Sequence, residues 1–166
     1  MKPSEFIKKY RKYAEQTEAK TGISAKFILA QSALETGWGE KAPGNMMFGV
    51  KAKRDTPNDK RQLIVTREVL SYPDNTSFPE IISVKKRPDG KYTYMVKDWF
   101  MKYESPEESF TDHAEFFLRN PRYAKALEVR DHPYLFADGV AKAGYATDPN
   151  YSDTLKAVIK TIERNY

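Results

Sequence analysis

Residues 24–39, SAKFILAQSALETGWG, are the stretch that decides the fold. Ser24 is a good N-cap, because its hydroxyl can accept a hydrogen bond from a backbone N–H of the first helical turn. Gly37 is a good stop, because glycine readily adopts the left-handed conformation that closes a helix. On a helical wheel the apolar stripe consists of Phe27, Ala30 and Leu34. The stretch therefore predicts a core helix whose last turn carries Glu35.

Glu35 is the candidate catalytic carboxyl of this helix. It falls beside or on the core face, where the negative end of the helix dipole disfavours the ionised form. Partial burial acts in the same direction, so both effects raise the pKa. A general acid that works near neutral pH needs such a pKa. Spacing alone also fits a surface glutamate that happens to end a helix.

The patterns on either side of this helix predict an α+β protein. Helical spacing is expected at 3–21, from Ser105 onward, and at 121–129, 133–143 and 150–163. Two segments rich in β-branched and aromatic residues are typical of strands: LIVTREVLSY (63–72) and KYTYMVKDWF (91–100). The segment RPDGK between them is a turn signal. We expect one domain over 1–166, a mostly helical body with a small antiparallel β-hairpin lobe inserted at about 60–100, and a cleft between the two for a polymer substrate.

Composition excludes several kinds of chemistry. The chain has 166 residues, no cysteine and two histidines. Disulfide scaffolds, thiolate zinc sites, cysteine nucleophiles and most histidine-rich metal centres are therefore excluded. His113 is expected to belong to an amphipathic helix and not to a metal site. We expect no metal and no cofactor, with the chemistry carried by carboxylates, hydroxyls and amides.

The positive charge of the chain is concentrated in its middle third. Residues 51–102 hold twelve basic and seven acidic side chains, which accounts for the whole net charge of +5. This distribution favours a polyanionic partner, although a solvated lysine-rich β surface would look the same. No apolar run is long enough for a signal peptide or a membrane span. We therefore expect a chain that is made in the cytosol and released by another route, or one that has lost its leader.

Five segments in order carry a resemblance to a known family. They are QSALETGWG (31–39), NMMFGVK (45–51), VTRE (65–68), NPRY (120–123) and AGYATDPNY (143–151). Together they resemble the peptidoglycan N-acetylglucosaminidases of glycoside hydrolase family 73, which include bacterial autolysins and the catalytic domain of the flagellar rod-cap hydrolases. The resemblance implies a lysozyme-like fold. It also implies cleavage of the β-1,4 bond between N-acetylglucosamine and N-acetylmuramic acid.

The resemblance assigns roles to two carboxylates. Glu35 would protonate the leaving glycosidic oxygen, and Glu68 would act as general base or electrostatic stabiliser. Inversion then depends on the separation of the two groups, whereas assistance by the substrate's acetamido group would make Glu68 less important. Alternation along the strand places Ile64, Thr66 and Glu68 on one face, where a glutamate is often simply solvated. Glu80 is the fallback for the second carboxylate.

The same resemblance suggests supporting residues. Tyr145 would line the cleft and donate a hydrogen bond to an acetamido group or to attacking water. Trp38 would stack on a sugar or plug the core, and Asn45 would bind the acetamido group or close a turn. Phe48 would shape the cleft floor, and Thr66 would contact substrate. Asp148 is expected to cap the last helix.

Other functions fit parts of the sequence. A muramidase or lytic transglycosylase also uses a glutamate at a helix end, and a non-catalytic glycan-binding or assembly module would keep the fold without the chemistry. A nucleic-acid binder would leave the contexts of the carboxylates unexplained, so no nucleic acid is expected. The expected partner is the peptidoglycan strand, bound by a monomer. A phage lysin would depend on a holin for release, a secreted toxin would need an immunity protein, and a piece of an autolysin fits equally well.

Overall fold

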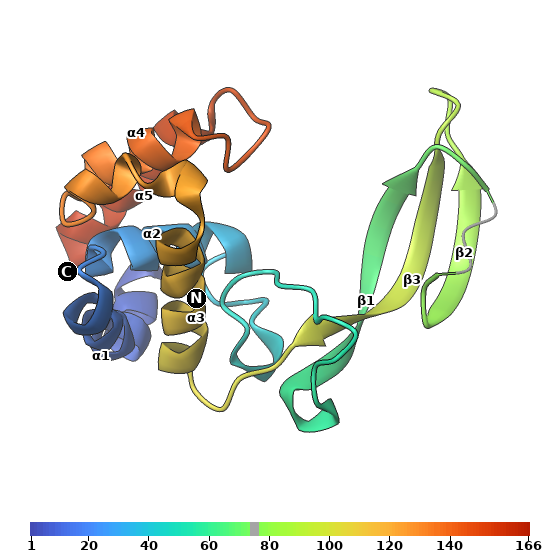
Figure 1. Ribbon diagram of the computed structural model, residues 1–166, viewed down its shortest axis with the longest axis horizontal. Helices are drawn as coiled ribbons and strands as arrows, with labels where there is room; N and C mark the ends of the chain where they lie inside the picture. Colours follow the sequence, from blue (N-terminus) through green and yellow to red (C-terminus); the bar gives the residue numbers. More distant parts are fainter. Residues whose placement is uncertain (74–76) are drawn as a thin grey trace. The chain divides into compact units, whose positions relative to one another are not determined.

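The computed structural model describes residues 1–73 and 77–166, and the chain forms two compact units. The first unit comprises Met1–Phe48 and Glu104–Tyr166 and is helical, whereas the second comprises Gly49–Tyr103 and contains the sheet (Figure 1). The predicted α+β class and the inserted β lobe are confirmed. No helix in the described part of the chain is long and apolar enough to cross a membrane.

The helical unit contains the predicted helices with one exception. Its helices are α1 (Pro3–Thr21), α2 (Ala25–Thr36), α3 (Pro106–Arg119), α4 (Pro133–Lys142) and α5 (Tyr151–Asn165), with short 3₁₀ turns η1 (Pro43–Asn45), η3 (Pro121–Tyr123) and η4 (Ala126–Val129). The single helix predicted at 121–129 is wrong, because η3 and η4 take its place. The backbone hydrogen bonds here join residues three apart, as in 3₁₀ turns: the Ala124 N–H donates to the Pro121 carbonyl at 3.1 Å and the Glu128 N–H to the Lys125 carbonyl at 3.2 Å.

The centre of the helical unit is α2. The Ser24 hydroxyl accepts from the Phe27 N–H at 3.4 Å, and Gly37 has a φ of 59°, so the predicted start and stop are confirmed. The predicted apolar stripe is wrong at Leu34, which is 36% exposed. Consecutive side chains Phe27, Ile28, Leu29 and Ala30 are all buried. The helix is therefore enclosed on every side along its middle, and only its last turn emerges.

Aromatic rings surround α2. Phe27 packs against Phe136 with ring centroids 4.6 Å apart and against Phe117 at 6.1 Å. Both contacts are close to edge-on, which is a favourable geometry for aromatic pairs. Phe117 also contacts Tyr123 at 5.0 Å and Tyr145 at 5.7 Å. The core is thus continuous with the segment that carries Tyr145.

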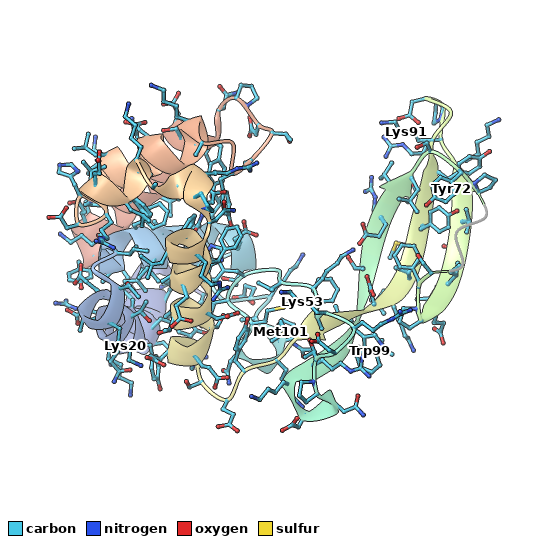
Figure 2. The ribbon with its side chains drawn as sticks, viewed as in Figure 1. Lys20, Lys53, Tyr72, Lys91, Trp99 and Met101 are labelled. Carbon is cyan, nitrogen blue, oxygen red and sulfur yellow. The ribbon has the colours of Figure 1, made fainter. Side chains whose placement is uncertain are left out.

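The second unit is a three-stranded antiparallel sheet in the order β1-β3-β2 (Figure 1). Its elements are the 3₁₀ turn η2 (Asn58–Lys60) and the strands β1 (Arg61–Leu70), β2 (Glu80–Lys86) and β3 (Tyr92–Met101). The predicted turn between β2 and β3 is confirmed, because the Arg87 N–H donates to the Lys91 carbonyl at 2.7 Å and Gly90 has a φ of 85°. Figure 2 shows Lys91 at this end of the sheet and Trp99 toward the other.

The two faces of the sheet differ in exposure. The predicted alternation along β1 is confirmed, because Ile64, Thr66 and Glu68 are half-buried while their neighbours are exposed. In register, Thr66 lies opposite Val96 and Glu68 opposite Tyr94, and both of these β3 side chains are fully buried. The more covered face is therefore the one that carries Glu68. The other face exposes the aliphatic side chains of Leu63, Val65 and Val69.

Candidate active site

Glu35 lies in the last turn of α2, one residue before the helix ends. Much of the surface of Glu35 is accessible to solvent. Its carboxyl group is nevertheless partly surrounded by protein atoms, and this burial raises its pKa above the usual value. No basic residue occurs in the last turn of α2, and among the described residues no cation pairs with Glu35. Because no cation offsets the desolvation, the Glu35 carboxyl keeps its proton to higher pH than a solvated glutamate does.

Two tyrosines share the surroundings of Glu35. Tyr145 follows Gly144, whose φ is 89°, and Tyr151 begins α5. Their rings stack with centroids 5.6 Å apart. Burial is the main cause that raises the pKa of both phenols, that of Tyr151 to about 12, and the charge of Glu35 adds to the effect at each. Both phenols therefore lie within electrostatic range of Glu35 and stay protonated at ordinary pH.

A buried hydrogen-bond network connects the tyrosines. The Gln31 side-chain amide donates to the Tyr151 hydroxyl at 2.9 Å. The Gln31 carbonyl oxygen lies 3.1 Å from His113 Nε2, and the same nitrogen lies 3.2 Å from the Tyr145 hydroxyl. Gln31 comes from the helix of Glu35, and His113 from α3. The network therefore ties both phenols to the framework of the helical unit.

The predicted substrate-binding residues of the helical unit differ in accessibility. Phe48 is buried and stacks on the His113 ring with centroids 3.8 Å apart, so it supports the network and offers no open ring face. Trp38 is half-buried with its ring edge-on to Phe6 at 5.5 Å, which favours the core-plug interpretation. Asn45 has a φ of 57° at the end of η1, consistent with closing a turn.

Asp148 does not cap α5 as predicted. Its carboxylate accepts from the Asn150 N–H at 2.8 Å, and Asn150 is itself the N-cap residue of the helix. The carboxylate thus fixes the turn that precedes α5. The aspartate lies two residues before the N-cap, so its side chain forms a local turn instead of reaching the first helical N–H groups.

Glu68 has a different environment from Glu35. It lies on β1 and accepts from Lys51 Nζ at 2.8 Å, and the same ammonium lies 3.4 Å from Asp98. The hydrogen bond to Glu68 is the main cause that raises the pKa of Lys51. Glu68 is therefore a half-buried carboxylate that forms an ion pair with Lys51. Thr66 precedes it by two residues on the same face.

Glu80, the fallback carboxylate, lies on the opposite face of the sheet. It is paired with Lys97 on β3 at 3.5 Å, whereas Glu68 is in register with Tyr94. Positions three apart on one strand point to opposite faces. Glu80 is also exposed. Only one of the two glutamates can therefore share a face with Thr66, and that one is Glu68.

The structure brings part of the predicted site together and adds residues that sequence reasoning missed. In the helical unit Glu35, Tyr145 and Phe48 belong to one neighbourhood, and Gln31, His113 and Tyr151 are new members of it. Gln31 and Tyr151 fall inside quoted motifs and so carried a signal, whereas His113 carried none beyond its aromatic neighbours. In the sheet unit Lys51 also falls inside a motif, but its pairing with Glu68 was not foreseen. Over residues 1–73 and 77–166, no group of three or more metal-ligating side chains could hold a metal ion.

The chemistry of these groups defines a class of enzyme. A carboxyl whose pKa is raised keeps its proton to higher pH and can deliver it to a leaving oxygen, and a second carboxylate can assist water or stabilise positive charge. Glycoside hydrolases use such a pair of carboxyl groups in unlike environments. The fold and the carboxyl groups therefore correspond to a glycoside hydrolase.

Comparison with known proteins identifies the family. Residues 11–164 match the glucosaminidase family, described as mannosyl-glycoprotein endo-beta-N-acetylglucosaminidase. The peptidoglycan hydrolase FlgJ of Vibrio parahaemolyticus is 35% identical over 97% of this chain and 48% of its own length, and the exo-glucosaminidase LytG of Bacillus subtilis is 28% identical over 93% and 50%. The chain spans about half the length of the curated relatives it matches. A C-terminally truncated glycoside hydrolase domain of Salmonella typhimurium FlgJ covers 98% of this chain and 99% of its own, with 29% identity and a TM-score of 0.75. The chain belongs to the glucosaminidase family of glycoside hydrolases.

Proposed function

We propose that this chain hydrolyses the β-1,4 bond between N-acetylglucosamine and N-acetylmuramic acid in bacterial peptidoglycan, with Glu35 as the general acid. The observation that carries the proposal concerns Glu35, a helix-end carboxyl that pairs with no cation among the described residues and whose pKa is raised by burial. The names of FlgJ and LytG, peptidoglycan hydrolase and exo-glucosaminidase, support the substrate class.

The protonated carboxyl of Glu35 would deliver its proton to the glycosidic oxygen as the bond to the anomeric carbon breaks. The product is a new reducing end on N-acetylglucosamine, and Glu35 is left as a carboxylate. General acid assistance of this kind is worth about 10²–10⁴-fold in rate. Tyr145 is half-buried with its hydroxyl proton retained, so it can donate to an acetamido group or to water beside Glu35.

Glu68 is our candidate for the second carboxylate. Its carboxylate accepts a hydrogen bond from Lys51 Nζ at 2.8 Å, which fixes its position on the sheet, and a carboxylate can act as a general base or stabilise an oxocarbenium ion. Thr66 on the same face is a candidate substrate contact. Glu80 is a weaker candidate because it is exposed and paired on the other face.

The charge of the sheet unit also supports an anionic polymer as the substrate. The stem peptides of peptidoglycan carry carboxylates, and the unit that contains Glu68 carries the entire net charge of +5. Opposite charges raise the rate of encounter. The proposed place of action is the bacterial cell wall.

The experiment that tests the proposal is product analysis. Purified peptidoglycan is digested with the wild type, with Glu35→Gln and with Glu115→Gln, an exposed glutamate of α3 that serves as the matched control. The products are reduced with borohydride, and the chain ends are identified by mass spectrometry. We expect reduced glucosamine ends from the wild type and from Glu115→Gln, and a loss of about 10³-fold or more with Glu35→Gln.

Each other outcome contradicts a defined part of the proposal. Reduced muramic ends would identify a muramidase, and anhydromuramic ends a lytic transglycosylase. Reduced glucosamine ends that persist with Glu35→Gln would remove the role of Glu35. If no new chain ends appeared with any type of peptidoglycan, the chain would be a glycan-binding or assembly module and not a hydrolase.

A further inference from the structure

The helical unit contains a pocket that is separate from the candidate active site. It lies between η4 and α4, has a volume of about 380 Å³, and is lined only by residues between positions 122 and 143. Sites for small ligands span about 300–1,000 Å³. The pocket is therefore large enough for the end of a peptide, and neither Glu35 nor Tyr145 lines it.

Small residues form the floor of this pocket. A Cβ atom added to Gly139 on α4 would lie 2.8 Å from the Cβ of Ala126 on η4, so a larger residue would push the two elements apart. Ala126 is buried, and Val129 and Ala143 are half-buried. Most of the surface inside the pocket is apolar. A ligand that fills it therefore needs a small aliphatic group, which gains free energy by leaving water.

Charged side chains surround this floor. Three of them are basic (Arg122, Lys125 and Lys142), one is acidic (Glu128), and all four residues are exposed. Within the part of the chain that the structure describes, none of the four forms an ion pair. Three cations without a counter-ion favour an anionic ligand.

The pocket thus suits a ligand that combines a carboxylate with a small aliphatic group. The guanidinium of Arg122 can bind both oxygens of a carboxylate, and the ammonium of Lys142 adds a second positive charge. Glu128 offers an acceptor to an amine of the same ligand. A phosphate group would use the cations but leave the apolar floor in contact with water. An acidic peptide with small side chains meets all of these requirements.

The pocket adjoins the segment that carries Tyr145. A Cβ atom added to Gly144, the residue before Tyr145, would lie 4.0 Å from Arg122 Nη1. Tyr123, which follows Arg122, has its ring centroid 6.5 Å from that of Tyr145. Both contacts lie within the helical unit. A ligand in the pocket therefore lies beside the segment of Tyr145.

We propose that this pocket binds the stem peptide of peptidoglycan, with a peptide carboxylate paired with Arg122 and Lys142 and an alanine-sized side chain on the floor. The identity of the peptide rests on the proposed function, whereas the binding of an acidic peptide does not. The consequence for the reaction is a preference for glycan that carries peptides over glycan from which they have been removed.

Binding is measured by NMR titration with a soluble stem pentapeptide, and the backbone amides of Gly139 and Gly144 report on the pocket. The matched control ligand is the same peptide with its carboxylates converted to carboxamides. We expect the acid to shift both glycine signals and the carboxamide to bind at least about fivefold more weakly. Equal binding of the two peptides, or no shift at the glycines, would overturn the proposal. Inorganic phosphate that binds as tightly as the acid would also overturn it, because the site would then select only charge.

Variants assign the binding to the pocket. Arg122→Ala should weaken binding of the acidic peptide about fivefold, and Arg122→Lys should fall between it and the wild type, because lysine keeps the charge but not the two-pronged geometry. The double variant Arg122→Ala/Lys142→Ala should bind no more tightly than the wild type binds the carboxamide. The matched control is Lys160→Ala/Arg164→Ala, which removes the same two charges from exposed positions on α5. An equal loss in the control would mean general electrostatic attraction and would overturn the proposal.

The consequence for the reaction is measured as a ratio of two kcat/KM values, one for intact peptidoglycan and one for glycan stripped of its peptides. We expect the wild type and Lys160→Ala/Arg164→Ala to favour the intact polymer about fivefold, and Arg122→Ala/Lys142→Ala to bring the ratio close to one. A merely structural role would lower both values and leave the ratio as it is, and that result would overturn the proposal.

The two proposals fail in distinguishable ways. A chain that binds the acidic peptide at Gly139 and Gly144 but cleaves neither polymer would refute the proposed function and leave the peptide pocket intact. A chain that cleaves both polymers equally and binds no peptide would refute the pocket and leave the proposed function intact.

Discussion

The helical unit and the sheet unit place their key carboxyl groups in opposite environments. In the helical unit, Glu35 sits at a helix end with two phenols nearby and no cation, and its pKa is raised. In the sheet unit, Glu68 forms an ion pair with Lys51, and this contact raises the pKa of Lys51. The two glutamates thus have different neighbours: protein atoms without a cation at Glu35, and an ammonium group at Glu68.

The two units also differ in how they are stabilised. The helical unit encloses α2 in a cluster of aromatic rings in which Phe27, Phe117 and Phe136 are almost entirely buried. The sheet unit buries Tyr94 and Val96 on one face, while Val65 on the other face is 52% exposed. The sheet unit also has a cation–π contact between β1 and β3, with the Arg61 guanidinium 3.9 Å from the centre of the Trp99 ring. A well-packed core therefore holds Glu35, whereas Glu68 lies on a three-stranded sheet with one exposed face.

The largest expected effect tests this difference in packing. Phe136→Ala should lower the free energy of unfolding by about 3–5 kcal/mol, because it removes a fully buried ring and leaves a cavity. Val65→Ala, on the exposed sheet face, should change it by less than about 0.5 kcal/mol. Urea unfolding followed by circular dichroism measures both variants. Equal losses in the two would show that the exposed face is covered in solution.

The next effect concerns the second carboxylate. Glu68→Gln should lower kcat/KM for glycan hydrolysis about 100-fold, because an amide cannot act as a base or stabilise positive charge. Glu80→Gln, on the opposite face of the same sheet, is the matched control and should stay within about twofold of the wild type. A loss of less than tenfold in Glu68→Gln would favour assistance by the substrate's acetamido group. A large loss in Glu80→Gln alone would assign the role to Glu80.

A smaller effect is expected from the cation that holds Glu68. Lys51→Met should lower kcat/KM about fivefold, because Glu68 and Asp98 lose the ammonium between them. Lys53→Met removes a nearby exposed lysine and should have no measurable effect (Figure 2). Both are assayed at low ionic strength, where surface ion pairs are least screened. A matching loss in the two variants would indicate general attraction of the substrate and no specific support of Glu68.

The smallest effect is a pH-dependent change in stability. The pKa of Glu35 is raised on folding, so its contribution to stability is complete below the unfolded value near 4.5 and is lost as pH rises through the folded value. Glu35→Gln should therefore be more thermostable than the wild type at pH 8, by at most about 2 °C, and no more stable at pH 4. Thermal unfolding at the two pH values measures this difference. A gain at pH 4 that disappears at pH 8 would mean that Glu35 is stabilised as a carboxylate.

Much of this protein could be predicted from its sequence. Ser24 and Gly37 set the limits of α2, and the alternation around Glu68 assigned a face, because capping and strand periodicity depend on neighbours a few residues away. The helix predicted at 121–129 and the exposure of Leu34 could not be obtained in this way. Both depend on which distant side chains cover a segment, and local spacing does not record them.

The sequence by itself determined the fold class, the place of Glu35 at a helix end, and the motifs that carry Tyr145 and Glu68. Only the tertiary structure decided which groups surround these residues. Gln31, His113 and Tyr145 are separated by 82 and 32 positions in the chain, and they meet through one imidazole nitrogen. Lys51 and Asp98 likewise come together at Glu68 only in the folded sheet. The protonation state of a carboxyl depends on neighbours within a few ångströms, and these are supplied by segments that are remote in sequence.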